Sequence, residues 1–152
     1  MAKKYIDDIV LENARIMFRN FSGEADKFTR EGDRSFCVVI EDPELAATLA
    51  NDGWNVRVLK PRDLDDEPTH YLQVKVSFKG YPPKVYLVTN SRKEELDEET
   101  INILDNCDIL SSDMVIRPYS YEVGGRSGIS AYLKELWVTI EETPFAHKYD
   151  HL

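Results

Sequence analysis

Alternating side chains in residues 71–79 constrain the fold of this chain more than any other feature of its sequence. The apolar positions are Leu72, Val74, Val76 and Phe78. The positions between them are Tyr71, Gln73, Lys75, Ser77 and Lys79. Because successive side chains of a strand point to opposite faces, this pattern predicts a half-buried strand. Residues 84–89 form a second β-rich run, and the intervening Gly80-Tyr81-Pro82-Pro83 predicts a hairpin that joins the two strands.

The same region is basic in an acidic protein. The chain has a formal net charge of −9 at pH 7, yet residues 69–90 contain Lys75, Lys79 and Lys84 and no acidic residue. Residues 53–62 also lack acids, whereas acids gather in the connecting segments 63–67 and 94–99. Two interpretations stay open: acids simply collect in solvated loops, or the basic strands form a surface for an anionic partner.

Turn signals and further β-rich runs predict the remaining elements. Strands are expected at residues 10–19, 34–40, 54–59, 113–123 and 129–141, and short helices at 44–51 and within 96–106. The first strand is expected to turn Val10, Ala14, Ile16 and Phe18 to one side. These elements predict a mainly β fold, a small antiparallel OB-like β-barrel of about five to seven strands with one or two short helices. Residues 1–142 are expected to form a single OB-like domain, and residues 143–152 a mobile C-terminal tail.

No motif for catalysis or for a bound cofactor is found in the sequence. The histidines have no partner at metal-ligand spacing, and neither a nucleophile elbow nor a phosphate-binding glycine loop is present. We therefore predict a protein that is not an enzyme and uses no cofactor or metal. Cys37 and Cys107 are too few for a disulfide framework, and each is interpreted as a small buried apolar residue.

Neither a membrane helix nor a secretory signal is predicted. No apolar run approaches the roughly 20 residues that a membrane helix needs, and residues 1–10 lack the apolar centre of a signal peptide. The cytoplasm is therefore the expected location, and no membrane partner is expected.

Rings and cations lie next to one another along the predicted strands and loops, which indicates binding. Aromatic faces stack on unpaired bases and basic side chains neutralise phosphates, so single-stranded nucleic acid is the expected partner. The expected DNA-binding residues are Arg19, Lys27, Arg30, Arg34, Trp54, Arg57, Lys60, Tyr71, Lys75, Lys79, Tyr81, Lys84, Tyr86, Arg117, Tyr119, Tyr121 and Arg126. Core packing is the alternative for each ring, and the favoured one for Phe18, Phe78 and Trp137.

Three segments resemble a known family: residues 11–16 (LENARI) with 18–21 (FRNF), residues 53–57 (GWNVR) and residues 128–134 (GISAYLK). On these segments the chain is similar to the single-stranded DNA-binding proteins encoded by many bacteriophages, an OB-fold group of similar length. The resemblance implies sequence-tolerant binding and protection of single-stranded DNA during phage replication and recombination in the infected cell, without catalysis. It also implies contacts with phage or host replication proteins through acidic segments. Because the tail from residue 141 is only weakly acidic, segments 63–67 and 94–99 are the candidates for that role.

Two other functions remain open at this stage. Tyrosine and arginine are also enriched at protein interfaces, so a phage structural or adaptor module without nucleic-acid binding has the same composition. A metal-dependent nuclease is the third hypothesis, disfavoured because residues 73–75 hold no acid where such a motif would need one. The sequence does not decide between DNA and RNA, and it leaves the oligomeric state open.

Overall fold

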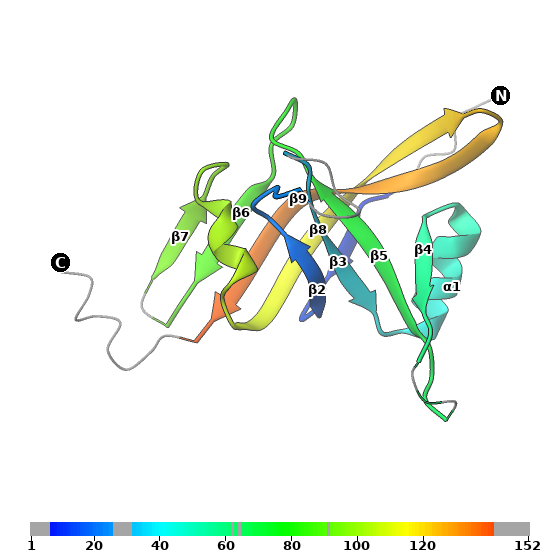
Figure 1. Cartoon of the computed structure of the whole chain (residues 1–152), viewed down its shortest axis with the longest axis horizontal. Coiled ribbons are helices and arrows are strands. Elements are labelled where there is room, and N and C mark those ends of the chain that lie inside the picture. Colours follow the sequence, from blue (N-terminus) through cyan, green and yellow to red (C-terminus); the bar gives the residue numbers. More distant parts are fainter. Residues whose placement is uncertain (1–6, 26–31, 62, 64, 91, 142–152) are drawn as a thin grey trace.

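The described residues form a single mixed sheet with two short helices packed on it (Figure 1). The computed structural model describes residues 7–25, 32–61, 63, 65–90 and 92–141. In chain order the elements are β1 (Ile9–Leu11), β2 (Ile16–Asn20), β3 (Arg34–Ile40), α1 (Pro43–Asp52), β4 (Val56–Leu59), β5 (Thr69–Val76), β6 (Lys84–Val88), β7 (Lys93–Leu96), the 3₁₀ helix η1 (Ile101–Asp105), β8 (Ile109–Val123) and β9 (Arg126–Ile140). The mainly β prediction is confirmed, with one α-helix and one 3₁₀ turn.

The described part of the chain holds nine strands, more than the five to seven expected. The predicted first strand is divided into β1 and β2, and residues 93–96, of which the first three are charged, form the additional strand β7. Charged side chains are compatible with β7 because it is an edge strand that pairs only with β6.

The longest strands, β8 and β9, form an antiparallel hairpin at the centre of the sheet. Their pairing runs from Ile109↔Ile140 to Val123↔Arg126, and the tip projects beyond the rest of the sheet (Figure 1). Gly124 and Gly125 have φ values of 58° and 82°, a backbone that tight hairpin turns require. The strand order is β1-β8-β9-β5-β3-β2, with β4 on β5, β6 on β9 and β7 on β6.

The predicted hairpin between β5 and β6 is wrong. Both strands pair with β9, and both pairings are parallel: β5 through Val74↔Ala131 and Lys75↔Tyr132, and β6 through Lys84↔Glu135 to Val88↔Thr139. The residues between them therefore carry the chain onward along β9 without reversing it. The sheet is mixed for this reason, and the expectation of purely antiparallel pairing is corrected.

The first predicted strand changes partner halfway along. β1 pairs with β8 and β2 pairs with β3, at opposite ends of the strand order. Asn13 and Phe18, with φ values of 50° and 51°, interrupt the alternation. As a result Val10 is 65% exposed and Phe18 is 60% exposed, although the pattern had placed both beside Ala14 and Ile16.

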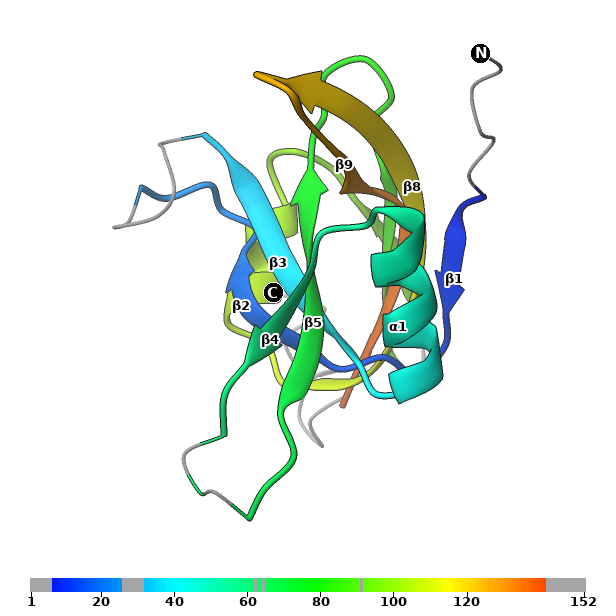
Figure 2. The ribbon, with the colours of Figure 1, turned by 90° about the vertical axis from the view of Figure 1, so that its right-hand side faces the viewer.

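The core lies on one face of the curved sheet. Leu72, Val74 and Val76 of β5 are buried, as their alternation predicts, while Phe78 is only half-buried at the edge of the core. Helix α1 begins at its N-cap Asp42, whose side chain accepts a hydrogen bond from the Glu44 amide at 3.0 Å. The helix lies beside β4 and β5 (Figure 2) and buries Ala46 and Leu49. Neither described helix has the length and apolar character needed to cross a membrane.

Candidate functional site

A groove crosses the outer face of β5, on the side opposite the core. It consists of two hollows with volumes of about 330 and 490 Å³, which share Gln73, Lys75 and Tyr132. The first hollow is lined also by Asn55, Arg57, Tyr119, Tyr121, Ser130 and Ala131. The second is lined also by Gly32, Asp33, Arg34, Ser35, Val76, Ser77, Phe78, Lys79 and Glu98. Because the three shared residues connect the hollows, we treat them as one groove.

Strand alternation places the shared residues on this face. In β5, Gln73 and Lys75 alternate with buried residues, and in β9 Tyr132 lies between buried Ala131 and Leu133. The parallel register sets Lys75 directly beside Tyr132, with its ammonium nitrogen 5.8 Å from the ring centroid. The pairing with β9 therefore brings the Tyr132 ring next to Lys75, which the sequence had predicted to bind DNA.

Tyr132 is also the centre of a cluster of rings and cations. The Arg117 guanidinium carbon lies 5.6 Å from the Tyr132 centroid and 5.5 Å from that of Tyr81, so one arginine contacts both rings. The Tyr119 ring meets Tyr132 edge-on at a centroid distance of 5.7 Å. Tyr81 and Tyr119 are 78% and 55% exposed. These contacts preorganise aromatic faces that remain open to solvent.

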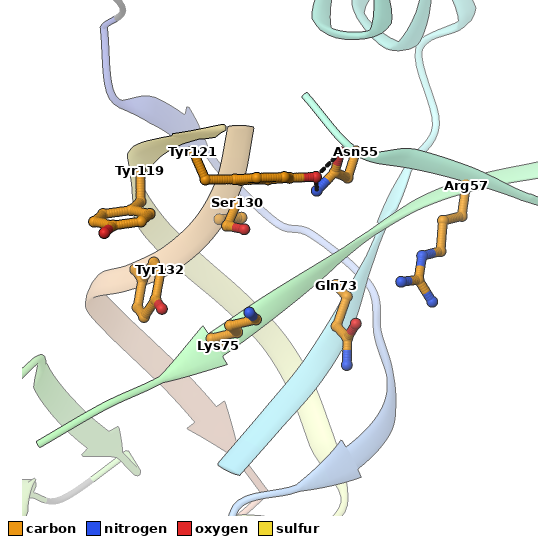
Figure 3. Close-up of a pocket in the computed structure, with 9 residues that line it drawn as sticks. Asn55, Arg57, Gln73, Lys75, Tyr119, Tyr121, Ser130 and Tyr132 are labelled. Carbon is orange, nitrogen blue, oxygen red and sulfur yellow. Dashed lines mark hydrogen bonds between the residues drawn. The ribbon is translucent and has the colours of Figure 1, made fainter. Parts of the chain in front are cut away.

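Tyr121 forms the rim of the first hollow (Figure 3). Its hydroxyl accepts a hydrogen bond from the Asn55 side-chain amide at 3.1 Å, which holds the ring across the end of β9. Gly128 lies under that ring: a Cβ at this position would come within 2.6 Å of the hydroxyl oxygen. The absence of a side chain at residue 128 is therefore what allows Tyr121 to lie flat there.

The groove is rich in cations, but its second hollow also contains acids. Arg34 contacts the Glu98 carboxylate at 3.5 Å, donates to the Phe21 carbonyl at 3.0 Å and lies 5.5 Å from the Phe78 centroid. Asp33 lies on the same wall. The first hollow, lined by Arg57 and Lys75 and by no acid, is therefore the more favourable place for an anion.

The fold brings many of the expected binding residues together. Six of them line the groove: Arg34, Arg57, Lys75, Lys79, Tyr119 and Tyr121. Arg117 adjoins the groove through its contact with the groove residue Tyr132, and Tyr81 contacts Arg117. Tyr71 lies on the same face of β5, one outward-facing position before Gln73.

Two of the expected residues have structural roles. Trp54 is 4% exposed and packs in the core, so its indole is not accessible to a base. The Arg19 guanidinium donates to the Leu104 and Cys107 carbonyls at 2.8 and 2.7 Å, which ties β2 to η1. Aromatic and basic residue types mark candidates for binding, but the core and the helix ends of a protein use the same side chains.

The remaining expected residues lie outside the groove or outside the described structure. Tyr86 packs against Trp137 with the ring centroids 4.3 Å apart and the planes tilted by 33°, in a separate cluster on β6, β7 and β9. The Lys93 ammonium lies 4.9 and 4.8 Å from the centroids of the two rings. Lys60, Lys84 and Arg126 are exposed but line neither hollow. Lys27 and Arg30 lie outside the described residues. Binding through these residues stays a prediction.

Sequence reasoning missed several groove residues. Tyr132, Asn55 and Ser130 were not among the expected binding residues, and Phe18, expected in the core, is exposed on the outer face. Alternation in residues 129–133 would have shown that Ser130 and Tyr132 share a face. No comparable signal exists for Phe18, because its position depends on a left-handed backbone.

Burial raises the pKa of the Cys37 thiol, an effect that Arg57 partly opposes, and burial likewise raises the pKa of Cys107. A raised pKa leaves less thiolate at a given pH, and the thiolate is the reactive form. We expect iodoacetamide to modify both cysteines of the folded protein slowly near pH 8 and faster only at higher pH. Peptide mass spectrometry measures each site, with urea-unfolded protein as the fast control; equal rates in folded and unfolded protein would contradict the expectation.

A mainly β domain with a cation-lined, ring-bearing groove on its outer face has the features of a single-strand-binding domain. The whole chain, residues 1–152, matches the family described as "Putative phage ssDNA-binding domain". The chain therefore belongs to this phage single-stranded-DNA-binding family, and the resemblance seen in its sequence is confirmed.

Solved structures of a protein from bacteriophage Enc34 share the fold. The single-stranded DNA-binding protein from bacteriophage Enc34 in complex with ssDNA has a TM-score of 0.53 at 18% identity, covering 91% of this chain and 89% of that chain. A second structure of the single-stranded DNA-binding protein from bacteriophage Enc34 has a TM-score of 0.52 at 18% identity, with 91% of this chain and 83% of that chain covered. The T7 protein gp2.5 has a TM-score of 0.38 at 11% identity, with 90% and 88% covered. No curated protein sequence matches the chain.

Proposed function

We propose that this protein binds single-stranded DNA along the groove, without sequence preference and without catalysis. The observation that carries the proposal is the cluster around Tyr132, where Lys75 and Arg117 lie against a ring that borders both hollows. Every base has an aromatic face and every nucleotide a phosphate, so such a surface is suited to any sequence. The Enc34 protein, which shares the fold, has been solved with ssDNA.

We place the groove on an OB-like barrel. The sheet order ends at β1 and β2, but the chain between them crosses from one end to the other. The Ala14 amide donates to the Ser112 carbonyl of β8 at 2.8 Å, and the Arg15 carbonyl accepts from the Val39 amide of β3 at 2.9 Å. These two hydrogen bonds connect the ends of the strand order and support closure. On this assignment β3 and β5 present the outer face that OB-folds use for oligonucleotides.

Binding of this kind would serve to cover and protect exposed single strands during phage DNA replication and recombination. The exposed acidic segment at Asp63, Asp65, Asp66 and Glu67, and the acids of β7 with residues 97–99, are the proposed contacts with phage or host replication proteins. These segments lie apart from the residues that line the groove, with the exception of Glu98.

Salt dependence tests the proposal. Binding of a fluorescent oligo-dT, followed by anisotropy, is expected to weaken steeply between about 50 and about 200 mM NaCl, with a log–log slope near −0.7 for each phosphate contacted. Oligo-dA should compete nearly as well as oligo-dT because stacking tolerates any base, whereas duplex DNA should compete poorly. Competition by an RNA oligonucleotide of the same length measures whether the protein prefers deoxyribose or ribose. Absence of a complex at micromolar protein and low salt would overturn the proposal and favour an adaptor protein.

A further inference from the structure

Phe18 is an apolar ring held out into solvent by an unfavourable backbone. Its side chain is 60% exposed, and its φ of 51° lies in the left-handed region that side chains with a Cβ rarely adopt. Among described non-glycine residues only Asn13 shares a positive φ, and asparagine tolerates it far better than phenylalanine. Strained backbone of this kind collects at binding and catalytic sites, where the surrounding structure maintains it.

The ring points to the face that carries the groove. Phe18 meets Tyr71 of β5 edge-on, at a centroid distance of 6.1 Å and an interplanar angle of 70°. Tyr71 shares its strand face with Gln73 and Lys75, which line both hollows. Side chains two residues apart on a strand are separated by roughly 6–7 Å, so Tyr71 lies one step beyond the groove.

A cation also reaches this position. Arg57 is the register partner of Tyr71 on β4 and lines the first hollow. Arg57 therefore provides a cation beside Tyr71, the residue whose ring Phe18 contacts, on the side of the first hollow.

We propose that Phe18 and Tyr71 form an additional base-stacking station at the end of the groove. A single strand leaving the first hollow past Gln73 would stack one further base on Phe18, with Tyr71 supporting the ring at its edge and Arg57 binding the adjoining phosphate. The proposal rests on the proposed function, because it extends the same DNA path. Continuity with the groove and the nearby cation favour a nucleotide over a protein as the occupant.

The Phe18→Gly variant tests this stacking position because it should weaken DNA binding without lowering the stability of the fold. Glycine adopts a φ near +51° without strain, and removal of an exposed ring leaves no cavity, so the Tm is expected to stay the same or rise. Affinity is then compared over oligo-dT lengths from about 4 to about 16 nucleotides, the range of site sizes known for one OB fold. The variant should match the wild type on the shortest oligonucleotides that bind and lose roughly five- to hundredfold on longer ones.

Matched variants sharpen the result. Phe18→Tyr keeps a stacking ring and should retain wild-type affinity at all lengths, whereas Phe18→Leu keeps an apolar group without a ring and should behave like Phe18→Gly. Leu110→Ala removes another exposed apolar side chain, 61% exposed and outside the groove, and should change nothing. The inference is overturned by a length-independent loss, by no loss, or by a marked fall in the Tm of Phe18→Gly. Failure of the wild type itself to bind any oligonucleotide would instead overturn the proposed function.

Discussion

Tyr132→Ala is expected to weaken oligo-dT binding by about tenfold to a hundredfold, the largest loss from any single ring. Base stacking on one aromatic side chain is worth about 1–3 kcal/mol, and each 1.4 kcal/mol corresponds to about tenfold in affinity. Tyr132 also supports Lys75 and Arg117 and contacts Tyr119, so its removal releases three neighbours that are otherwise held in place. Anisotropy titrations at constant salt measure the loss.

Tyr86→Ala is the matched control for this prediction. Tyr86 also contacts a ring and a lysine, but in the separate cluster with Trp137 and Lys93, outside the groove. If the strand follows the groove and does not use Tyr86, as the sequence had predicted that it would, the Tyr86→Ala variant should bind oligo-dT like the wild type. Tyr132→Phe, which keeps the ring, should do the same. Equal losses for Tyr132→Ala and Tyr86→Ala would contradict the location of the site, as would full binding by Tyr132→Ala. Thermal unfolding of each variant separates lost binding from lost structure.

Lys75→Glu is expected to lower affinity by tenfold or more at low salt. The substitution removes a phosphate contact and places a carboxylate where both hollows meet. The loss should shrink as salt rises, because the Debye length falls from about 30 Å at 0.01 M to about 10 Å at 0.1 M. The neutral variant Lys75→Gln should lose less and should reduce the slope of the salt dependence by about 0.7, the value for one contact to a single strand.

Arg15→Glu provides the control for net charge. It changes the charge of the protein by the same amount, and its exposed side chain lines a different hollow, between β2 and the start of β8. If affinity follows overall charge alone, Arg15→Glu and Lys75→Glu will be equally impaired, which would contradict a localised groove. If the groove is the site, the Arg15 variant will bind nearly as well as the wild type.

Sequence patterns correctly predicted the elements that depend on interactions between residues close together in the chain. Helix α1 was expected at residues 44–51 and is found at Pro43–Asp52, because an aspartate N-cap, a proline in the first turn and a following glycine act within a few residues. Strand β5 buries Leu72, Val74 and Val76 and exposes the face with Lys75, since a strand has a period of two.

Predictions that required knowledge of the neighbouring strand were wrong. β5 and β6 were expected to pair with each other, but β9 lies beside both of them. Trp54 was expected to bind DNA and is buried, with its backbone bonded to the end of α1 and paired with Ile129 of β9. The sequence does not show whether an aromatic side chain packs in the core or is exposed for binding. The elements that surround the side chain in the fold determine this.

By itself, the sequence determined which face of β5 is polar and cationic, where the helix begins and ends, and that residues 69–90 of this acidic chain are basic and rich in aromatic residues. Only the tertiary structure decided that Lys75 lies beside Tyr132, that Arg117 joins Tyr81 to that ring, and that Phe18 is exposed. The reason is that alternation specifies the face of a side chain, whereas backbone hydrogen bonds are the same for every residue type. Which strands become neighbours depends on how the whole core packs, and the groove is a product of those neighbours.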